Sequence, residues 1–147
     1  MKNVITNSVG DKRWYKNGKL HREDGPAIEY ADGDKDWYKN GKLHRDDGPA
    51  MEYTGGAKYW YINNKHHRED GPAIESSDGK NFWYLDDEEF TEEEFLIEVK
   101  KIVQVRSQLD ALKSGLSITV DGERYTLLKS CVQTVTVDGK KYSLLGE

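Results

Sequence analysis

Four tryptophans recur at a constant interval and define an internal repeat. They are separated by 23 residues, and the segments that begin at them read WYKNGKLHREDGPAIEYADGDKD, WYKNGKLHRDDGPAMEYTGGAKY and WYINNKHHREDGPAIESSDGKNF, followed by WYLDDEEF. The four residues are Trp14, Trp37, Trp60 and Trp83. A fixed period of this length is typical of repeat architectures, in which each unit buries its apolar surface against its neighbours. The repeat predicts an extended array.

Two turn signals divide each repeat. The first is a pair that tolerates positive φ at both positions, as a two-residue type I′ hairpin requires: Asn17-Gly18, Asn40-Gly41, Asn63-Asn64 and Asp86-Asp87. The second comes half a repeat later, at Asp32-Gly33, Gly55-Gly56 and Asp78-Gly79. We therefore expect two short strands per repeat, one around Trp-Tyr and one around GPAIEY, in a meandering antiparallel sheet.

The pattern resembles the MORN repeat, which has the same period and runs approximately YxGxWxxGKxHGxGxxxxxDG. The matching positions are Trp37, Asn40, Gly41, Lys42, His44 and the Asp32-Gly33 pair, and the resemblance covers residues 5 to about 90. This chain departs by writing HRxDGPA where a MORN unit has HGxG. The variant WYxNGxxHRxDGPA is similar to repeat proteins common in bacteriophage and large-virus genomes. The resemblance implies a non-enzymatic binding scaffold without a cofactor.

Composition and charge narrow the class of protein further. The net charge of −5 lies wholly in residues 86–114, and neither flanking part is net positive, so the basic face that nucleic-acid binding needs is not indicated. A single Cys131 cannot form an intramolecular disulfide, and the N-terminal residues lack the pattern of a secretory signal. We expect a cytoplasmic protein, in the host cell if viral, without a membrane-spanning segment.

The histidines and the possible catalytic motifs do not indicate an enzyme. His21, His44 and His67 fall in register, about 10 Å apart if one strand intervenes, which is too far for neighbouring rings to share a metal ion. His44-Arg45-Asp46 copies a kinase catalytic-loop sequence, but the glycine-rich loop and other kinase motifs are missing. The sequence also contains no GxSxG, HExxH, phosphate-loop or dinucleotide-binding motif. We predict no catalytic residue and no metal site.

The tyrosine, histidine and arginine rows are the candidate binding residues: Tyr15, Tyr38, Tyr61, His21, His44, His67, Arg22, Arg45 and Arg68. Tyrosine and arginine are frequent at the centres of protein interfaces. Alternatively, each arginine pairs with the aspartate two residues on, and the tyrosines belong to the core. The tryptophans are expected to form the core of a thin sheet, with Ile28, Met51 and Ile74 filling the gaps between them.

Residues 91–114 change period and predict an amphipathic helix over 91–113, because a Thr91/Glu94 capping box precedes a helical apolar pattern. The expected buried stripe is Phe95, Leu96, Val99, Ile102, Val103, Leu109 and Leu112. Residues 115–147 contain a duplication, SITVDGERYTLLK and TVTVDGKKYSLLG, which predicts two β-hairpins. The proposed organisation is a repeat sheet over 1–90, the helix, and a duplicated hairpin segment for capping or oligomerisation. We favour a homo-oligomer through the helix and these hairpins.

Two functions remain open from the sequence. The first is a non-enzymatic, phage-encoded repeat protein that binds and inhibits a bacterial protein, most plausibly one of an antiviral defence system. The second is a sponge that sequesters a cyclic or ADP-ribose-type nucleotide immune signal, because repeated arginine and histidine donors beside tyrosine rings could hold phosphates and bases.

Overall fold

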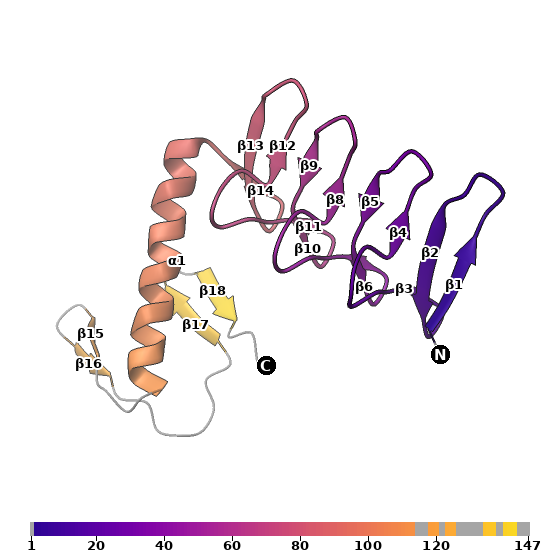
Figure 1. Cartoon of the computed structure of the whole chain (residues 1–147). Coiled ribbons are helices and arrows are strands. Elements are labelled where there is room, and N and C mark those ends of the chain that lie inside the picture. Colours follow the sequence, from indigo (N-terminus) through magenta and orange to yellow (C-terminus); the bar gives the residue numbers. More distant parts are fainter. Residues whose placement is uncertain (1, 114–117, 121–122, 126–133, 138–139, 144–147) are drawn as a thin grey trace. The chain divides into compact units, whose positions relative to one another are not determined.

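The computed structural model describes residues 2–113, 118–120, 123–125, 134–137 and 140–143 (Figure 1). The chain divides into two compact units, Met1–Phe95 and Leu96–Glu147. The protein is mainly β, a meandering antiparallel sheet of many short strands followed by one long helix, as the repeat predicted. In the described part of the chain, no helix is both long enough and apolar enough to cross a bilayer.

The first unit holds the repeats. Its strands are β1 (Lys2–Thr6), β2 (Lys12–Lys16), β3 (Lys19–Leu20), β4 (Ile28–Glu29), β5 (Lys35–Asp36), β6 (Tyr38–Lys39), β7 (Lys42–Leu43), β8 (Met51–Glu52), β9 (Lys58–Tyr59), β10 (Tyr61–Ile62), β11 (Lys65–His66), β12 (Ile74–Glu75), β13 (Asn81–Leu85) and β14 (Glu88–Phe90). The main sheet runs β1-β2-β4-β5-β8-β9-β12-β13-β14, with antiparallel neighbours. Figure 1 shows its larger hairpins side by side.

The predicted turn chemistry is confirmed. The central residues of all four Asn-Gly-type pairs have positive φ, from 53° at Asn17 to 83° at Gly41, as a type I′ turn requires. At the opposite edge, Gly33 has a φ of 97° and donates its N–H to the Tyr30 carbonyl at 3.0 Å. Gly10, Gly56 and Gly79 repeat this geometry. The turns at both ends of the strands are therefore determined by local sequence.

The number of strands in each internal repeat differs from the prediction. The segment around Trp37 is divided into β5 and β6, and a further short strand, β7, follows the Asn-Gly turn. The cause is a change of hydrogen-bond partner at the tryptophan. The Trp37 N–H donates to the Ala50 carbonyl at 2.8 Å, while the Trp37 carbonyl accepts from the His44 N–H at 3.1 Å. Each internal tryptophan thus lies where the chain passes from the main sheet into a short hairpin.

Successive short hairpins are joined through their turns. The N–H of Gly41 donates to the Leu20 carbonyl at 2.8 Å, and the N–H of Asn64 donates to the Leu43 carbonyl at 2.9 Å. Asn64 stands where the earlier repeats have glycine, and its Oδ1 also accepts from the Leu43 N–H at 2.7 Å. In the next repeat, Asp87 Oδ1 likewise accepts from the His66 N–H at 2.7 Å. These substitutions therefore add a hydrogen bond between repeats that glycine cannot make.

The core of this unit is shallow. Ala27, Ala50 and Ala73 are completely buried and Ile28 is 5% exposed, whereas the large aromatic side chains remain partly accessible. Each buried alanine lies opposite a tryptophan, whose N–H its carbonyl accepts at 2.8 Å. The sheet therefore depends on contacts between repeats more than on a thick apolar core.

Helix α1 spans Glu92–Lys113 and begins with the predicted capping box. Thr91 Oγ1 accepts from the Glu94 N–H at 3.3 Å, and Glu94 Oε2 accepts from the Thr91 N–H at 3.0 Å. The predicted stripe was too wide, because Leu96 and Val103 are more than half exposed. Val105, outside that stripe, is buried with Phe95 and Leu109. Leu96 and Val103 are each one residue, or about 100° of rotation, beyond Phe95 and Ile102, so they leave the buried face.

Within its described residues, the second unit also contains four short strands. These are β15 (Ile118–Val120), β16 (Glu123–Tyr125), β17 (Thr134–Val137) and β18 (Lys140–Ser143), and β15 pairs with β16 and β17 with β18, both antiparallel. The predicted turns Asp121-Gly122 and Asp138-Gly139, the leucine pairs and Cys131 lie outside the described residues. The two-hairpin arrangement of 115–147 therefore stays a prediction.

Candidate functional site

The strand register assigns the aromatic rows to opposite faces of the repeat sheet. Ile28 lies directly opposite Asp36, and Met51 lies opposite both Asp36 and Tyr59. Directly opposite residues share a face, and residues alternate between faces along a strand. One face, here named the tyrosine face, carries Tyr15, Tyr30, Tyr38, Tyr53, Tyr59, Tyr61 and Tyr84 beside the isoleucine and methionine row. The other, the tryptophan face, carries Trp14, Trp37, Trp60 and Trp83.

This assignment corrects the predicted packing of the tryptophans. Ile28, Met51 and Ile74 were expected to fill the gaps between the tryptophan rings, but they lie on the opposite face. The partner of each tryptophan is instead an arginine. The guanidinium carbons of Arg22, Arg45 and Arg68 lie 4.0, 4.1 and 3.9 Å from the ring centroids of Trp14, Trp37 and Trp60. These are cation–π contacts.

Each stacked guanidinium is also held by hydrogen bonds. Arg45 Nε donates to Asp47 Oδ1 at 3.0 Å, and Arg45 Nη1 donates to Glu52 Oε1 at 2.8 Å and to the Pro49 carbonyl at 3.2 Å. Arg22 and Arg68 make the equivalent bonds in their repeats. The predicted pairing of each arginine with the aspartate two residues on is confirmed. The guanidinium groups are engaged within the sheet.

A glycine completes each arginine site. A Cβ placed on Gly48 would lie 2.9 Å from Arg45 Cζ, and the corresponding distances at Gly25 and Gly71 are 3.1 and 3.0 Å. The guanidinium therefore lies against a glycine as well as a tryptophan. This arrangement accounts for the motif HRxDGPA. The arginine stacks on tryptophan, the aspartate and the proline carbonyl accept its hydrogen bonds, the glycine leaves it room, and the buried alanine accepts the tryptophan N–H with its carbonyl.

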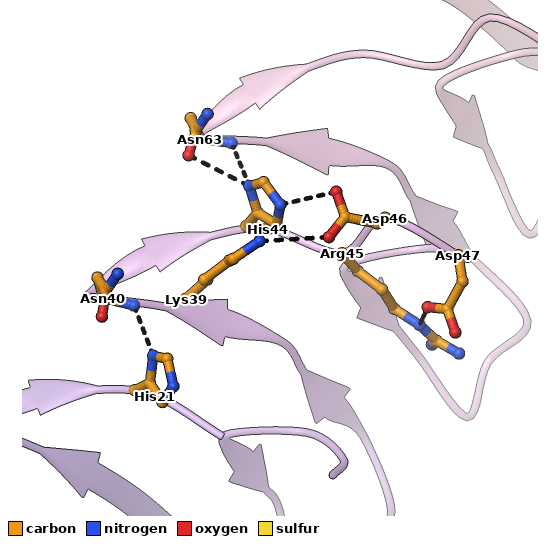
Figure 2. Close-up of polar contacts among 8 residues, drawn as sticks. All are labelled: His21, Lys39, Asn40, His44, Arg45, Asp46, Asp47 and Asn63. Atoms are coloured by element: carbon orange, nitrogen blue, oxygen red, sulfur yellow. Dashed lines mark hydrogen bonds and ion pairs between the residues drawn. The ribbon is translucent and has the colours of Figure 1, made fainter. Parts of the chain in front are cut away.

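The histidines lie on the tryptophan face and connect one repeat to the next. Figure 2 shows His44 between the turn of the following repeat and Asp46: the Asn63 N–H donates to His44 Nδ1 at 3.2 Å, and Nε2 lies 3.0 Å from Asp46 Oδ1. Nδ1 accepts this backbone N–H, because an N–H can only donate, and Asn63 Oδ1 lies at the same distance of 3.2 Å from Nδ1. His21 receives the Asn40 N–H in the same way at 3.0 Å. The histidine row thus has a structural role between repeats.

His67 differs from the other two because carboxylates lie at both ring nitrogens. Its Nε2 is 3.3 Å from Glu69 Oε1 and its Nδ1 is 3.1 Å from Asp86 Oδ1. The hydrogen bond to Glu69 is the largest cause that raises the pKa of His67 above its ordinary value of 6.5; Asp86 adds to it, and burial opposes both. Protonation of His67 therefore stabilises the fold below pH 6.5, and this contribution is lost as the pH rises through the raised pKa.

Asp86→Asn is expected to lower the pKa of His67 toward 6.5, because it removes one of the two carboxylates. Asparagine suits the backbone, since Asn63 holds the same turn position one repeat earlier with a φ of 54° against 55° at Asp86. An NMR pH titration of the His67 ring measures the shift. An identical titration curve in the variant would show that Asp86 does not act on this ring.

The predicted site residues are thus divided between the two faces. The arginines and histidines lie together on the tryptophan face and are bonded within the sheet, while Tyr15, Tyr38 and Tyr61 lie on the tyrosine face and are half-buried. The rings of Tyr61 and Tyr84 lie 4.2 and 5.2 Å from the His66 ring. Burial is the largest cause that raises the pKa of Tyr38 and of Tyr61, so both phenols stay neutral at physiological pH.

One polar pair on the tyrosine face was not predicted from the sequence. Asp36 is only 4% exposed, and Tyr30 Oη donates to its Oδ2 at 2.9 Å. Desolvation raises the pKa of the Asp36 carboxyl, the hydrogen bond from Tyr30 opposes that shift, and the neighbouring Asp34 charge adds to it. Aligning the repeats gives the signal that could have found it, since this column reads Arg13, Asp36, Tyr59 and Phe82.

Comparison of the chain with protein-family models, with curated proteins and with solved structures finds no match. Across the described residues, no three His, Cys, Asp or Glu side chains are grouped so that they could hold a metal ion. The site is therefore defined by its own geometry: a tryptophan face occupied by internal contacts, and a tyrosine face whose aromatic side chains are partly accessible.

Proposed function

We propose that this chain is a non-enzymatic, MORN-like binding scaffold whose tyrosine face contacts a protein partner. The observation that carries the proposal is the row of partly exposed tyrosines beside the isoleucine and methionine row, with Tyr53 itself 38% exposed. Tyrosines provide a large contact area with two rotatable side-chain bonds and a polar tip. They are enriched at the residues that dominate binding energy. A repeated surface of this kind suits recognition of another protein.

The partner we propose is a host bacterial protein, most plausibly a component of an antiviral defence system that the bound scaffold inhibits. The resemblance to repeat proteins of bacteriophages and large viruses supports this choice. Self-association is a further part of the proposal, because Leu96, Ile97 and Val103 of α1 are each more than half exposed. The helix and the duplicated C-terminal segment would then join copies of the chain.

Nucleotide sequestration is the weaker candidate. It required repeated arginines whose guanidinium groups were free to bind phosphate, but Arg22, Arg45 and Arg68 each make internal carboxylate contacts and stack on tryptophan. These arginines also lie on the face opposite the tyrosines. The geometry therefore favours a protein partner, and a nucleotide is an outcome that the experiment can reveal.

Capture from bacterial lysate tests the proposal. The Tyr38→Thr/Tyr61→Thr variant is expected to lose a protein that the wild type retains, because threonine keeps strand propensity but removes both rings. The matched control is Lys35→Thr/Lys58→Thr. These two exposed lysines lie on the opposite face, in strands β5 and β9, which directly precede the strands that carry Tyr38 and Tyr61. Circular dichroism shows whether each variant folds.

Mass spectrometry of the protein and nucleotide fractions then distinguishes binding of a protein partner from sequestration of a nucleotide. A bacterial protein retained by the wild type and the lysine variant, and lost by the tyrosine variant, supports binding through the tyrosine face. Equal retention by all three variants would contradict that assignment. A nucleotide released on heating, without a retained protein, would support sequestration instead.

A further inference from the structure

Asp36 is a buried carboxylate for which the described residues supply no cation. It lies on the tyrosine face at the end of β5, is 4% exposed, and has the Tyr30 hydroxyl as its hydrogen-bond donor. Arg13, across Ile28 in the same row, lies instead 3.3 Å from Asp11. The nearby Asp34 is itself an acid, and its carboxylate accepts hydrogen bonds from the N–H and the hydroxyl of Thr54. A buried charge without an opposite partner destabilises the fold.

The sheet itself does not require an acid at this position. Arginine, tyrosine and phenylalanine occupy it in the other copies of the repeat, at Arg13, Tyr59 and Phe82, and all four residues pair in the same antiparallel register. The carboxylate is therefore specific to one repeat rather than part of the repeat design. It places one carboxylate in a row that otherwise holds Arg13 and aromatic and aliphatic side chains.

The surroundings of Asp36 fit one kind of ligand group. Ile28 and Met51 lie directly beside it on the neighbouring strands, and Tyr38 lies two residues along the same face. Tyr53, the most exposed ring of this group, stands in edge-to-face contact with Tyr59 at 5.6 Å between centroids. Aromatic rings attract cations, and aliphatic side chains pack against the methylene stem of lysine or arginine.

We propose that Asp36 receives an arginine or lysine side chain of the protein partner. The cation pairs with the carboxylate, its stem packs on Ile28 and Met51, and the rings of Tyr38 and Tyr53 shield the pair from water. Arginine is favoured over lysine, because its planar guanidinium can donate two hydrogen bonds to one carboxylate and stack on a ring. This inference rests on the proposed function, since it names what the tyrosine face recognises.

Binding of small probes tests the inference without the partner. Nα-acetyl-arginine methylamide and its citrulline analogue have nearly the same shape but differ in charge, and NMR of the tyrosine rings reports binding of each. On the wild type, arginine is expected to bind about tenfold more tightly than citrulline, the scale of a charge-assisted hydrogen bond. The preference is expected to disappear in Asp36→Asn.

Two variants serve as controls for this titration. Asp32→Asn removes an equal charge at the exposed turn while keeping a side-chain oxygen for the Asp34 N–H, and it should keep the arginine preference. Tyr30→Phe removes the hydrogen bond to Asp36 but not its charge, and should keep it too. Equal binding of the two probes to the wild type, or an arginine preference that persists in Asp36→Asn, would overturn the inference.

The lysate capture separates this inference from the proposed function. A partner lost by both Asp36→Asn and the Tyr38→Thr/Tyr61→Thr variant supports both. A partner retained by Asp36→Asn but lost by the tyrosine variant overturns the basic-anchor inference and leaves the tyrosine face as the binding surface. A partner retained by the tyrosine variant overturns the proposed surface itself.

Discussion

Arg45→Met is expected to lower the free energy of unfolding of the repeat sheet by about 3 kcal/mol. The substitution keeps a long side chain over Trp37 but removes the cation–π contact and the bonds to Asp47, Glu52 and the Pro49 carbonyl. It also leaves Glu52, which is 34% exposed, without its partner. Urea unfolding followed by circular dichroism measures the loss.

Lys39→Met provides the matched comparison for this effect. Lys39 also pairs with an aspartate, at 3.4 Å from Asp46, but both side chains are more than half exposed. Removing an exposed ion pair changes stability by at most about 1 kcal/mol. Similar losses for Arg45→Met and Lys39→Met would mean that the stacked arginine contributes no more than an ordinary surface charge.

The sequence predicted the parts of this fold that depend on local chemistry. The 23-residue period identified the array, and the Asn-Gly-type pairs identified the tight turns, because positive φ at two adjacent positions restricts the residues that can stand there. The capping box at Thr91 marked the start of α1 for the same reason. In each case a few neighbouring residues determine the geometry.

The packing of the two faces depended on register, which the period alone does not supply. Aligned repeats show that Trp37 and Met51 recur together, but not that they face opposite sides of the sheet. That fact follows only when Met51 is placed opposite Asp36. The arginine pairing was predicted only in part, since the link to Asp47 is local whereas the contacts with Trp37 and Glu52 need the folded repeat.

The repeat period was also an incomplete guide to the candidate site. The tyrosine row was selected because it recurs, and recurrence also selected the arginines and histidines that the sheet uses internally. Asp36 was missed because it does not recur. In this chain, recurrence alone therefore does not separate the residues that maintain the array from those of a binding surface, whereas Asp36 stands at a position that the repeat does not require to be acidic.

The glycine of HRxDGPA should also be sensitive to substitution, because it lies against the stacked arginine. Gly48→Ala is expected to destabilise the sheet by about 1–3 kcal/mol, because its Cβ would lie 2.9 Å from Arg45 Cζ and must push the guanidinium off Trp37.

Gly55→Ala is the control, since a Cβ there meets no atom within 4 Å and the backbone has no positive φ. That change should be neutral or stabilise the sheet by up to about 1 kcal/mol, through the lower entropy of the unfolded chain. Urea unfolding measures both variants, and the Arg45→Met/Gly48→Ala double variant locates the cause. If the clash with the guanidinium is responsible, Gly48→Ala costs much less once methionine replaces Arg45; an undiminished cost would place the strain in the backbone instead.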